Sequence, residues 1–195
     1  CESGVLVPTL CPLGCSTGAC RAVVPSNVGA AVPFTAGTAD VVVPNGELWF
    51  FDSDTGGIGI YDATSGAFVR TLRAAGAGTT GGIHYAQVAT SAVGAPAHGV
   101  FVMRTLRVEN GGAIVGTRGT ARSLVLLVGG DVQIDGSVNV RAADTGPGPG
   151  GARGGNAESN GGGSGGGGGG TTGDGFDAAD DGGGGGASFG GSGGT

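Results

Sequence analysis

The sequence contains no lysine, and all nine of its basic residues are arginine. This absence excludes lysine isopeptide cross-links, Schiff-base chemistry and a P-loop nucleotide site. No apolar run approaches the roughly 18 residues that a membrane-spanning helix needs. The fifteen acidic residues give a net charge of −6, which argues against nucleic acid and anionic membranes as partners.

Glycine is abundant instead, with 49 residues in a chain of 195, and it dominates the C-terminal quarter. Ordering ten such residues would cost roughly 10–20 kcal/mol, and glycine offers no side chain to bury in return. An ordered tail must therefore satisfy its backbone N–H and C=O groups against neighbouring segments. We expect some of these neighbours to come from other copies of the protein.

Three glycine-dense stretches of similar length cover residues 146–155, 161–170 and 182–194. They predict three extended rods of the polyglycine II type, to which Pro147 and Pro149 are suited. Each rod would be about 30 Å long at ~3.1 Å per residue. An ordinary flexible Gly/Ser linker is the alternative.

All four cysteines lie within the first twenty residues, at Cys1, Cys11, Cys15 and Cys20. An even number in a short Pro/Gly-rich segment predicts two disulfides, and hence a secreted protein that is extracellular or on a cell surface. The sequence leaves the pairing open, and a zinc site is the competing interpretation. The start at Cys1 fits either a mature chain, with or without a lipid on Cys1, or a piece of a longer precursor.

A repeated strand pattern marks the middle of the chain. The copies read VxVxNGxLxF from Val41, LxVxNGxAxV from Leu106 and VxIDGxVxV from Val132. Each predicts a strand, a tight turn and a second strand. An array of hairpins would fit, but so would a β-solenoid, in which each strand pairs with its counterpart one coil further on.

The solenoid is the favoured fold because the last two copies start 26 residues apart, which suits a three-faced coil. The apolar run at 123–128 is typical of a strand buried on both faces. We therefore predict an all-β chain: a disulfide-linked segment (1–38), a short right-handed parallel β-solenoid (39–145) and a polyglycine II-type bundle (146–195). A β-sandwich with a glycine-rich tail is the alternative.

Asp52 and Asp54, with Asp62 further on, are candidate calcium ligands because alternate carboxylates followed by glycine resemble half of a calcium loop. Gly56 and Ala63 stand where that loop would need acidic ligands. A turn capped by aspartate side chains is the alternative. No other cofactor is expected.

Catalytic patterns are formal matches only. Ser164 and Ser192 fit GxSxG inside low-complexity glycine, without the strand-to-helix context of a hydrolase. His84 and His98 have no catalytic partner nearby in sequence. Polysaccharide cleavage would need further cationic or calcium-binding residues along a groove. We expect no enzymatic activity.

The segment CPLGCSTGACR at 11–21, the strands around 124–134 and the glycine-rich end resemble secreted surface proteins of myxobacterial type. That resemblance implies a cysteine module, a haemagglutinin-like solenoid and a glycine-rich tail, with no catalytic residues. The glycine stretches also resemble the polyglycine bundles of springtail antifreeze proteins and phage adhesin tips.

Together these features predict a structural subunit of an extracellular fibre or surface layer. Its partners would be other copies of itself, joined through solenoid ends and glycine rods. A surface adhesin that binds glycans is the alternative function.

Overall fold

The computed structural model describes residues 15–16, 19–20, 32–90, 96–142 and 147–151. Most of the predicted segment 1–38, and the glycine-rich tail beyond residue 151, lie outside these ranges. The described residues form β-strands and one 3-10 helix, η2 (Phe34–Ala36), without an α-helix. The all-β prediction is confirmed. No helix in this part of the chain has the length and hydrophobicity needed to cross a bilayer.

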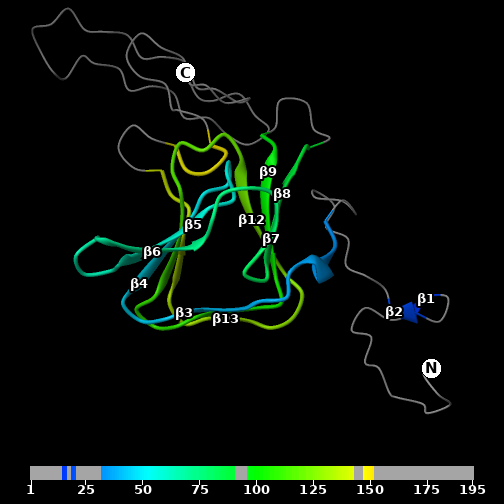
Figure 1. Cartoon of the computed structure of the whole chain (residues 1–195), viewed down its shortest axis with the longest axis horizontal. Coiled ribbons are helices and arrows are strands. Elements are labelled where there is room, and N and C mark those ends of the chain that lie inside the picture. The colour runs from blue at the N-terminus through cyan, green and yellow to red at the C-terminus, as the bar shows by residue number, and fades with distance from the viewer. Residues whose placement is uncertain (1–14, 17–18, 21–31, 91–95, 143–146, 152–195) are drawn as a thin grey trace, which may run out of the picture.

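The strands, in chain order, are β1 (Cys15–Ser16), β2 (Ala19–Cys20), β3 (Asp40–Val43), β4 (Glu47–Phe51), β5 (Ile58–Asp62), β6 (Phe68–Arg73), β7 (Gly78–Thr80), β8 (Ile83–Val88), β9 (His98–Met103), β10 (Thr105–Val108), β11 (Ala113–Gly116), β12 (Ser123–Val128), β13 (Val132–Ile134) and β14 (Ser137–Asn139). β1 and β2 pair with each other, and the other strands form three sheets. Figure 1 shows β3 and β13 below, β4, β5 and β6 on the left, and β8, β9 and β12 on the right.

Parallel pairing links successive passes of the chain in all three sheets. Val41, Leu106 and Val132 are partners in the β3–β10–β13 ladder. The β4–β11–β14 and β9–β12 ladders are also parallel. The three sequence copies are therefore not hairpins: each strand pairs with its counterpart in the next copy, as the solenoid interpretation expected.

The Asn-Gly and Asp-Gly dipeptides form the corners between two of these sheets, and glycine is needed there for two reasons. Gly46 and Gly111 both have φ of 82°, a conformation that favours glycine. At Gly136 the limit is space, because a Cβ atom would lie 2.2 Å from the carbonyl oxygen of Gly112. The corners thus stack with their backbones in close approach.

Two antiparallel hairpins interrupt the repeat between its first and second copies. β5 and β6 extend the sheet beyond β4, and β7 and β8 extend another sheet beyond β9. This insertion explains why the first two copies start much further apart than the last two. The repeat pattern did not predict it.

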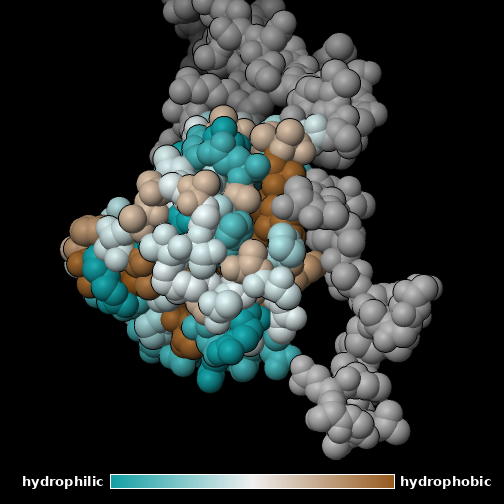
Figure 2. Space-filling model, turned by 45° about the vertical axis from the view of Figure 1, so that its right-hand side comes forward, coloured by the Kyte–Doolittle hydropathy of each residue, from teal (hydrophilic) through white to brown (hydrophobic). Residues whose placement is uncertain are grey.

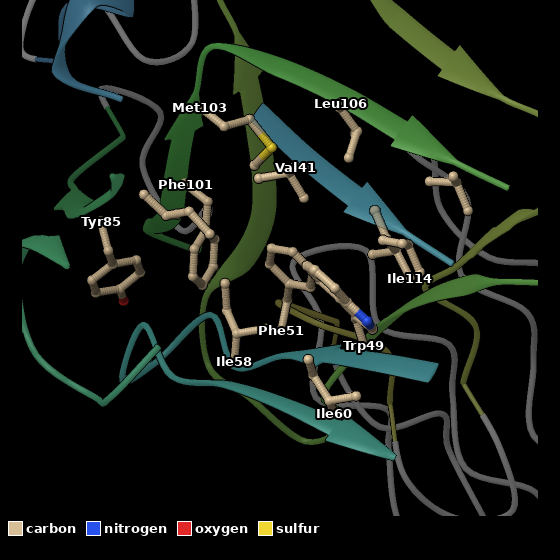
Figure 3. Packing of buried hydrophobic residues seen from close by; sticks show 13 residues of the cluster. Val41, Trp49, Phe51, Ile58, Ile60, Tyr85, Phe101, Met103, Leu106 and Ile114 are labelled. Atoms are coloured by element: carbon tan, nitrogen blue, oxygen red, sulfur yellow. The ribbon is translucent and has the colours of Figure 1, made fainter. Parts of the chain in front are cut away.

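The main core fills the interior between the sheets. Phe51 and Phe101, both fully buried, meet edge to face with ring centroids 5.0 Å apart. Figure 3 shows Ile58, Trp49 and Val41 pointing into the same interior. Alternation supplies this core, since inward residues on each strand are apolar and buried.

A second apolar cluster lies outside this interior, on β8, β9 and β12. It includes Val100, Val102 and Leu127, with Val32 and Phe34 from the segment that precedes β3. Figure 2 shows that hydrophobic residues otherwise reach the surface in separate patches among neutral and hydrophilic ones. β9 is thus apolar on both faces because both faces are covered.

The prediction that strand 123–128 is buried on both faces is wrong for most of its residues. Leu127 is buried, whereas the other five residues of β12 are only partly buried. The physical reason is its position, because β12 is the last strand of its sheet among the described residues. A strand at an edge keeps part of its surface open to solvent.

Candidate assembly surface

The three sheets end on the same pass of the chain. β12, β13 and β14 are consecutive in sequence, and among the described residues each is the edge strand of its own sheet. An edge strand presents a row of N–H and C=O groups without a partner strand. We call this surface, made by β12, β13, β14 and Val140, the open end.

Apolar side chains continue onto the open end, where the described part of the chain supplies no further layer to bury them. Val132 is 54% exposed, whereas its partner Leu106 one pass earlier is 3% exposed. Val138 is 42% exposed, whereas its partner Ile114 is fully buried. Ile134 and Val140 are also about half exposed. The open end therefore exposes residues that occupy core positions in the preceding coil.

The sequence of these strands carries little of the usual protection against pairing between molecules. Natural edge strands are blunted by lysine, proline or inward-pointing charges. β12, β13 and β14 read SLVLLV, VQI and SVN, with neither charge nor proline. Asp131 and Asp135 flank β13, so electrostatic protection is confined to the ends of that strand.

The opposite end is built differently, because the two hairpins cover the edges of β4 and β9 there. Among the described residues, strand edges remain at this end too, at β3, β6 and β7, but β6 and β7 belong to the inserted hairpins and not to the repeat. We call this surface, formed by the β5–β6 and β7–β8 hairpins, the closed end.

A buried arginine holds the closed end together. The Arg73 side chain is 1% exposed, and its guanidinium donates hydrogen bonds to the carbonyl oxygens of Ile83, Gly56, Ala74, Gly76 and Gly78, at 2.5–3.2 Å. Burial lowers the pKa of Arg73 from its ordinary value, but arginine stays charged in proteins. These carbonyl dipoles solvate the buried charge and join both hairpins to the turn after β4.

Tyr85 completes this arrangement. Its ring lies 5.5 Å from the Arg73 guanidinium carbon, and its hydroxyl donates a 2.7 Å hydrogen bond to the Ser53 carbonyl. Burial raises the pKa of the Tyr85 hydroxyl. A Cβ at position 56 would lie 2.3 Å from the same ring, so Gly56 gives the turn room to pass.

The candidate calcium ligands are not brought together. Asp52 Oδ1 accepts hydrogen bonds from the backbone N–H groups of Asp54 and Thr55, which confirms the capped-turn interpretation at that residue. Asp62 lies at the other end of the β4–β5 pair, opposite Glu47, and caps its own turn. No group of three His, Cys, Asp or Glu side chains within the described ranges is placed to hold a metal ion.

Asp54 links two passes of the chain. Its carboxylate accepts hydrogen bonds from the backbone N–H groups of Ala121 and Arg122 at 2.9 and 3.0 Å, and from Arg122 Nη1 at 3.1 Å. The neighbouring Ser53 hydroxyl donates to the Arg122 carbonyl. The motif selected as a cation loop is therefore a structural bridge between the first and second repeats, which sequence spacing does not reveal.

Each histidine contacts a hydroxyl group on a neighbouring strand. His84 Nδ1 lies 2.9 Å from Thr79 Oγ1, and His98 Nδ1 contacts Ser123 Oγ. The latter contact follows from register, since His98 and Ser123 are partners in the β9–β12 ladder. A hydroxyl–imidazole contact alone does not make a catalytic triad, which also needs an orienting acid and oxyanion donors.

Most of the remaining predicted site residues lie outside the described residues. Cys15 and Cys20 are backbone partners in the β1–β2 pair, while Cys1 and Cys11 lie outside the described residues. Ser164, Ser192 and most of the three glycine stretches also lie outside, so the polyglycine II interpretation stays a prediction.

The described segment 147–151 lies against the second repeat. The Pro147 carbonyl accepts a hydrogen bond from the Gly119 N–H, and the Gly150 N–H donates to the Thr120 carbonyl. A Cβ at position 150 would lie 2.4 Å from the Ser123 nitrogen, so glycine is needed for this contact. The start of the glycine-rich region thus joins the corner that leads into β12.

Comparison of the chain with protein-family models, curated proteins and solved structures found no match.

Proposed function

We propose that this protein is a structural subunit of an extracellular fibre or surface layer, and that its copies associate through the open end. The observation that carries the proposal is the coincidence of three edge strands and four half-exposed apolar side chains on one surface. Exposed, uncharged strand edges are templates for pairing with another chain.

The finer fold is part of this proposal. Parallel ladders in three sheets, with passes 24 to 26 residues apart in the later copies, support a short right-handed parallel β-solenoid. They disfavour the sandwich alternative, because sandwich sheets are antiparallel. In a solenoid, the open end is where the next coil would stack.

The free energies involved indicate that side-chain burial at the open end alone gives weak association. Burying the remaining exposed half of four Val or Ile side chains would contribute about 4 kcal/mol, from ~1.5–3 kcal/mol per complete side chain. Loss of translational and rotational freedom costs about 4–15 kcal/mol. Backbone hydrogen bonds, at ~1 kcal/mol each, must supply the difference.

The closed end also limits growth through solenoid ends. Because hairpins extend two of its three sheets, its outermost strands β6 and β7 are not part of the repeat and do not match the open end. Two open ends can meet and form a closed pair. Growth beyond that pair would depend on a second contact, which we assign to the predicted glycine rods of residues 146–195, in an extracellular setting consistent with the cysteine-rich start.

Light scattering on a sizing column and electron microscopy test the proposal together. The full chain should show concentration-dependent dimers or larger species. The double variant Val132→Lys/Val138→Lys should shift them toward monomer by placing charge on the open end. Val69→Lys is the matched control, since Val69 is similarly exposed but lies on β6 at the closed end.

A monomer at all concentrations would reject the proposal. Equal loss of association in Val69→Lys would reject the assignment to the open end. If the protein forms dimers but never filaments or layers, the contact through the open end would stand and the proposal of a fibre or surface layer would be rejected.

A further inference from the structure

A concave area lies on the outer face of the five-stranded sheet and borders the open end at β14. It encloses about 510 Å³, and its floor includes Phe50 of β4 and Val115 of β11. Its polar rim is formed by Thr117, Arg118, Ser137 and Asn139. Phe50, Val115, Ser137 and Asn139 alternate with the inward residues of their strands, so the area lies outside the core.

An aromatic row extends this area across the neighbouring strands. The Phe50 and Tyr61 rings are 4.8 Å apart, and the Tyr61 and Phe68 rings are 5.4 Å apart, both edge to face. Gly59, opposite Phe50, leaves room for this row, since a Cβ there would lie 3.1 Å from the Tyr61 ring. Phe68 is 57% exposed. From β14 to β6, the surface is about 19 Å wide at ~4.8 Å between strands.

The charge of this area differs from that of the whole protein. Arg118 is the one charged residue in its lining, within a chain of net charge −6. Arg118 is exposed, and none of the ion pairs found among the described residues includes it. A guanidinium without a carboxylate partner favours a ligand that supplies one, because arginine binds carboxylates through two parallel hydrogen bonds.

We propose that this outer face binds an acidic polysaccharide, with uronate-containing pyranose rings lying on the Phe50 region and a carboxylate on Arg118. A pyranose has apolar C–H faces and hydroxyl groups around its edge, which matches an apolar floor with a hydroxyl and amide rim. An extended peptide would pair with the edge strand β14 and would not lie over the floor, because β4 and β11 are already paired on both sides.

This binding does not require self-assembly: the area shares β14 with the open end, but its floor and Arg118 lie outside the open end. A protein that remains monomeric could still bind the polysaccharide, and an assembling protein could fail to do so. The two proposals therefore fail separately.

The test is isothermal titration calorimetry of the full chain with polygalacturonate, in a chelator to exclude calcium bridging. The comparison ligand is the methyl-esterified polymer, which keeps the sugar rings but neutralises the carboxylates. We expect saturable binding of the acid form and at least about tenfold weaker binding of the ester, equivalent to ~1.4 kcal/mol.

Arg118→Gln should weaken binding of the acid form about tenfold without changing the weaker binding of the ester. Phe50→Leu should weaken both, because it removes the flat ring but keeps an apolar side chain. Arg107→Gln is the matched control: Arg107 is also exposed, but lies on β10 in another sheet. Circular dichroism would establish that each variant is folded.

Absence of binding to polygalacturonate would overturn the proposal. Equal binding of the acid and the ester would overturn the role of the carboxylate. Equal weakening by Arg107→Gln and Arg118→Gln would show diffuse attraction to arginine and overturn the assignment of the site. Binding of an extended peptide in preference to either polymer would identify a different class of ligand.

Discussion

The two ends of the repeat differ in whether the strands of the last coil are covered. At the closed end, inserted hairpins cover two sheet edges and Arg73 satisfies five carbonyl groups around them. At the open end, the repeat stops with three edges and its apolar residues half exposed. The difference shows that this sequence can encode a cap, and that it encodes one within the described residues only at one end.

The largest effect should come from breaking the closed end at Arg73. Arg73→Met removes the donors of several buried carbonyl groups, each at roughly 1–3 kcal/mol when left without a partner. We expect a loss of about 3 kcal/mol or more in the free energy of unfolding, measured by urea denaturation. Arg73→Lys should recover little, because an ammonium group cannot reach carbonyls spread around a planar guanidinium.

Arg70→Met is the control for that experiment. Arg70 lies on the same strand, but its side chain is 53% exposed and its single ion pair with Glu47 spans 3.4 Å. Exposed ion pairs contribute little to stability. A loss as large as that of Arg73→Met would show that the buried network is not the cause.

The next effect compares two valines of one ladder. Val41→Ala, at a residue 4% exposed, should destabilise the fold by about 2 kcal/mol through lost burial and a cavity. Val132→Ala, in register with it through Leu106, should change the free energy of unfolding by well under 1 kcal/mol in dilute solution. Equal losses would mean that Val132 is already buried in the isolated chain.

The repeat and its strand pairing could be predicted from the sequence. The three pattern copies and their spacing predicted which residues pair, and the ladders joining Val41, Leu106 and Val132 have that register. Apolar alternation also predicted the inward residues. These features are local or periodic, so one sequence is enough to reveal them.

The closed end could not be predicted in the same way. In the sequence Arg73 looks like an ordinary exposed arginine at the end of a mixed strand, and only the fold gathers its five carbonyl partners. Asp54 was chosen for its spacing from Asp52, but its partners are the N–H groups of Ala121 and Arg122, nearly seventy residues away. The sequence shows which side chains are polar, but contacts between turns far apart in the sequence decide which of these side chains stabilise the fold.

A smaller effect should come from salt. Asp131 and Asp135 flank β13 on the open end, and the whole chain has a net charge of −6. Raising ionic strength from 0.01 to 0.15 M shortens the screening length from about 30 to 8 Å. Association should therefore strengthen with salt, as measured by sedimentation equilibrium; weaker association in salt would indicate a contact held by opposite charges.

The smallest effect concerns acid and the start of β3. Hydrogen bonds from Arg104 and Thr105 lower the pKa of the Asp40 carboxyl to about 2, from an ordinary 3.8. Because the folded-state pKa is the lower one, the stabilising effect is complete above pH 4 and is lost as the pH falls toward 2. Asp40→Asn should make the urea midpoint of unfolding depend slightly less on pH between pH 4 and 2. An unchanged pH dependence would contradict the role of the Asp40–Arg104 pair.

Hydrogen exchange at two protein concentrations tests the open end most directly. Raising the concentration into the range where copies associate should slow exchange of backbone amides in β12, β13 and β14, and leave β6 and β7 unchanged. Exchange that is independent of concentration in all five strands, or slowed only in β6 and β7, would contradict association through the open end.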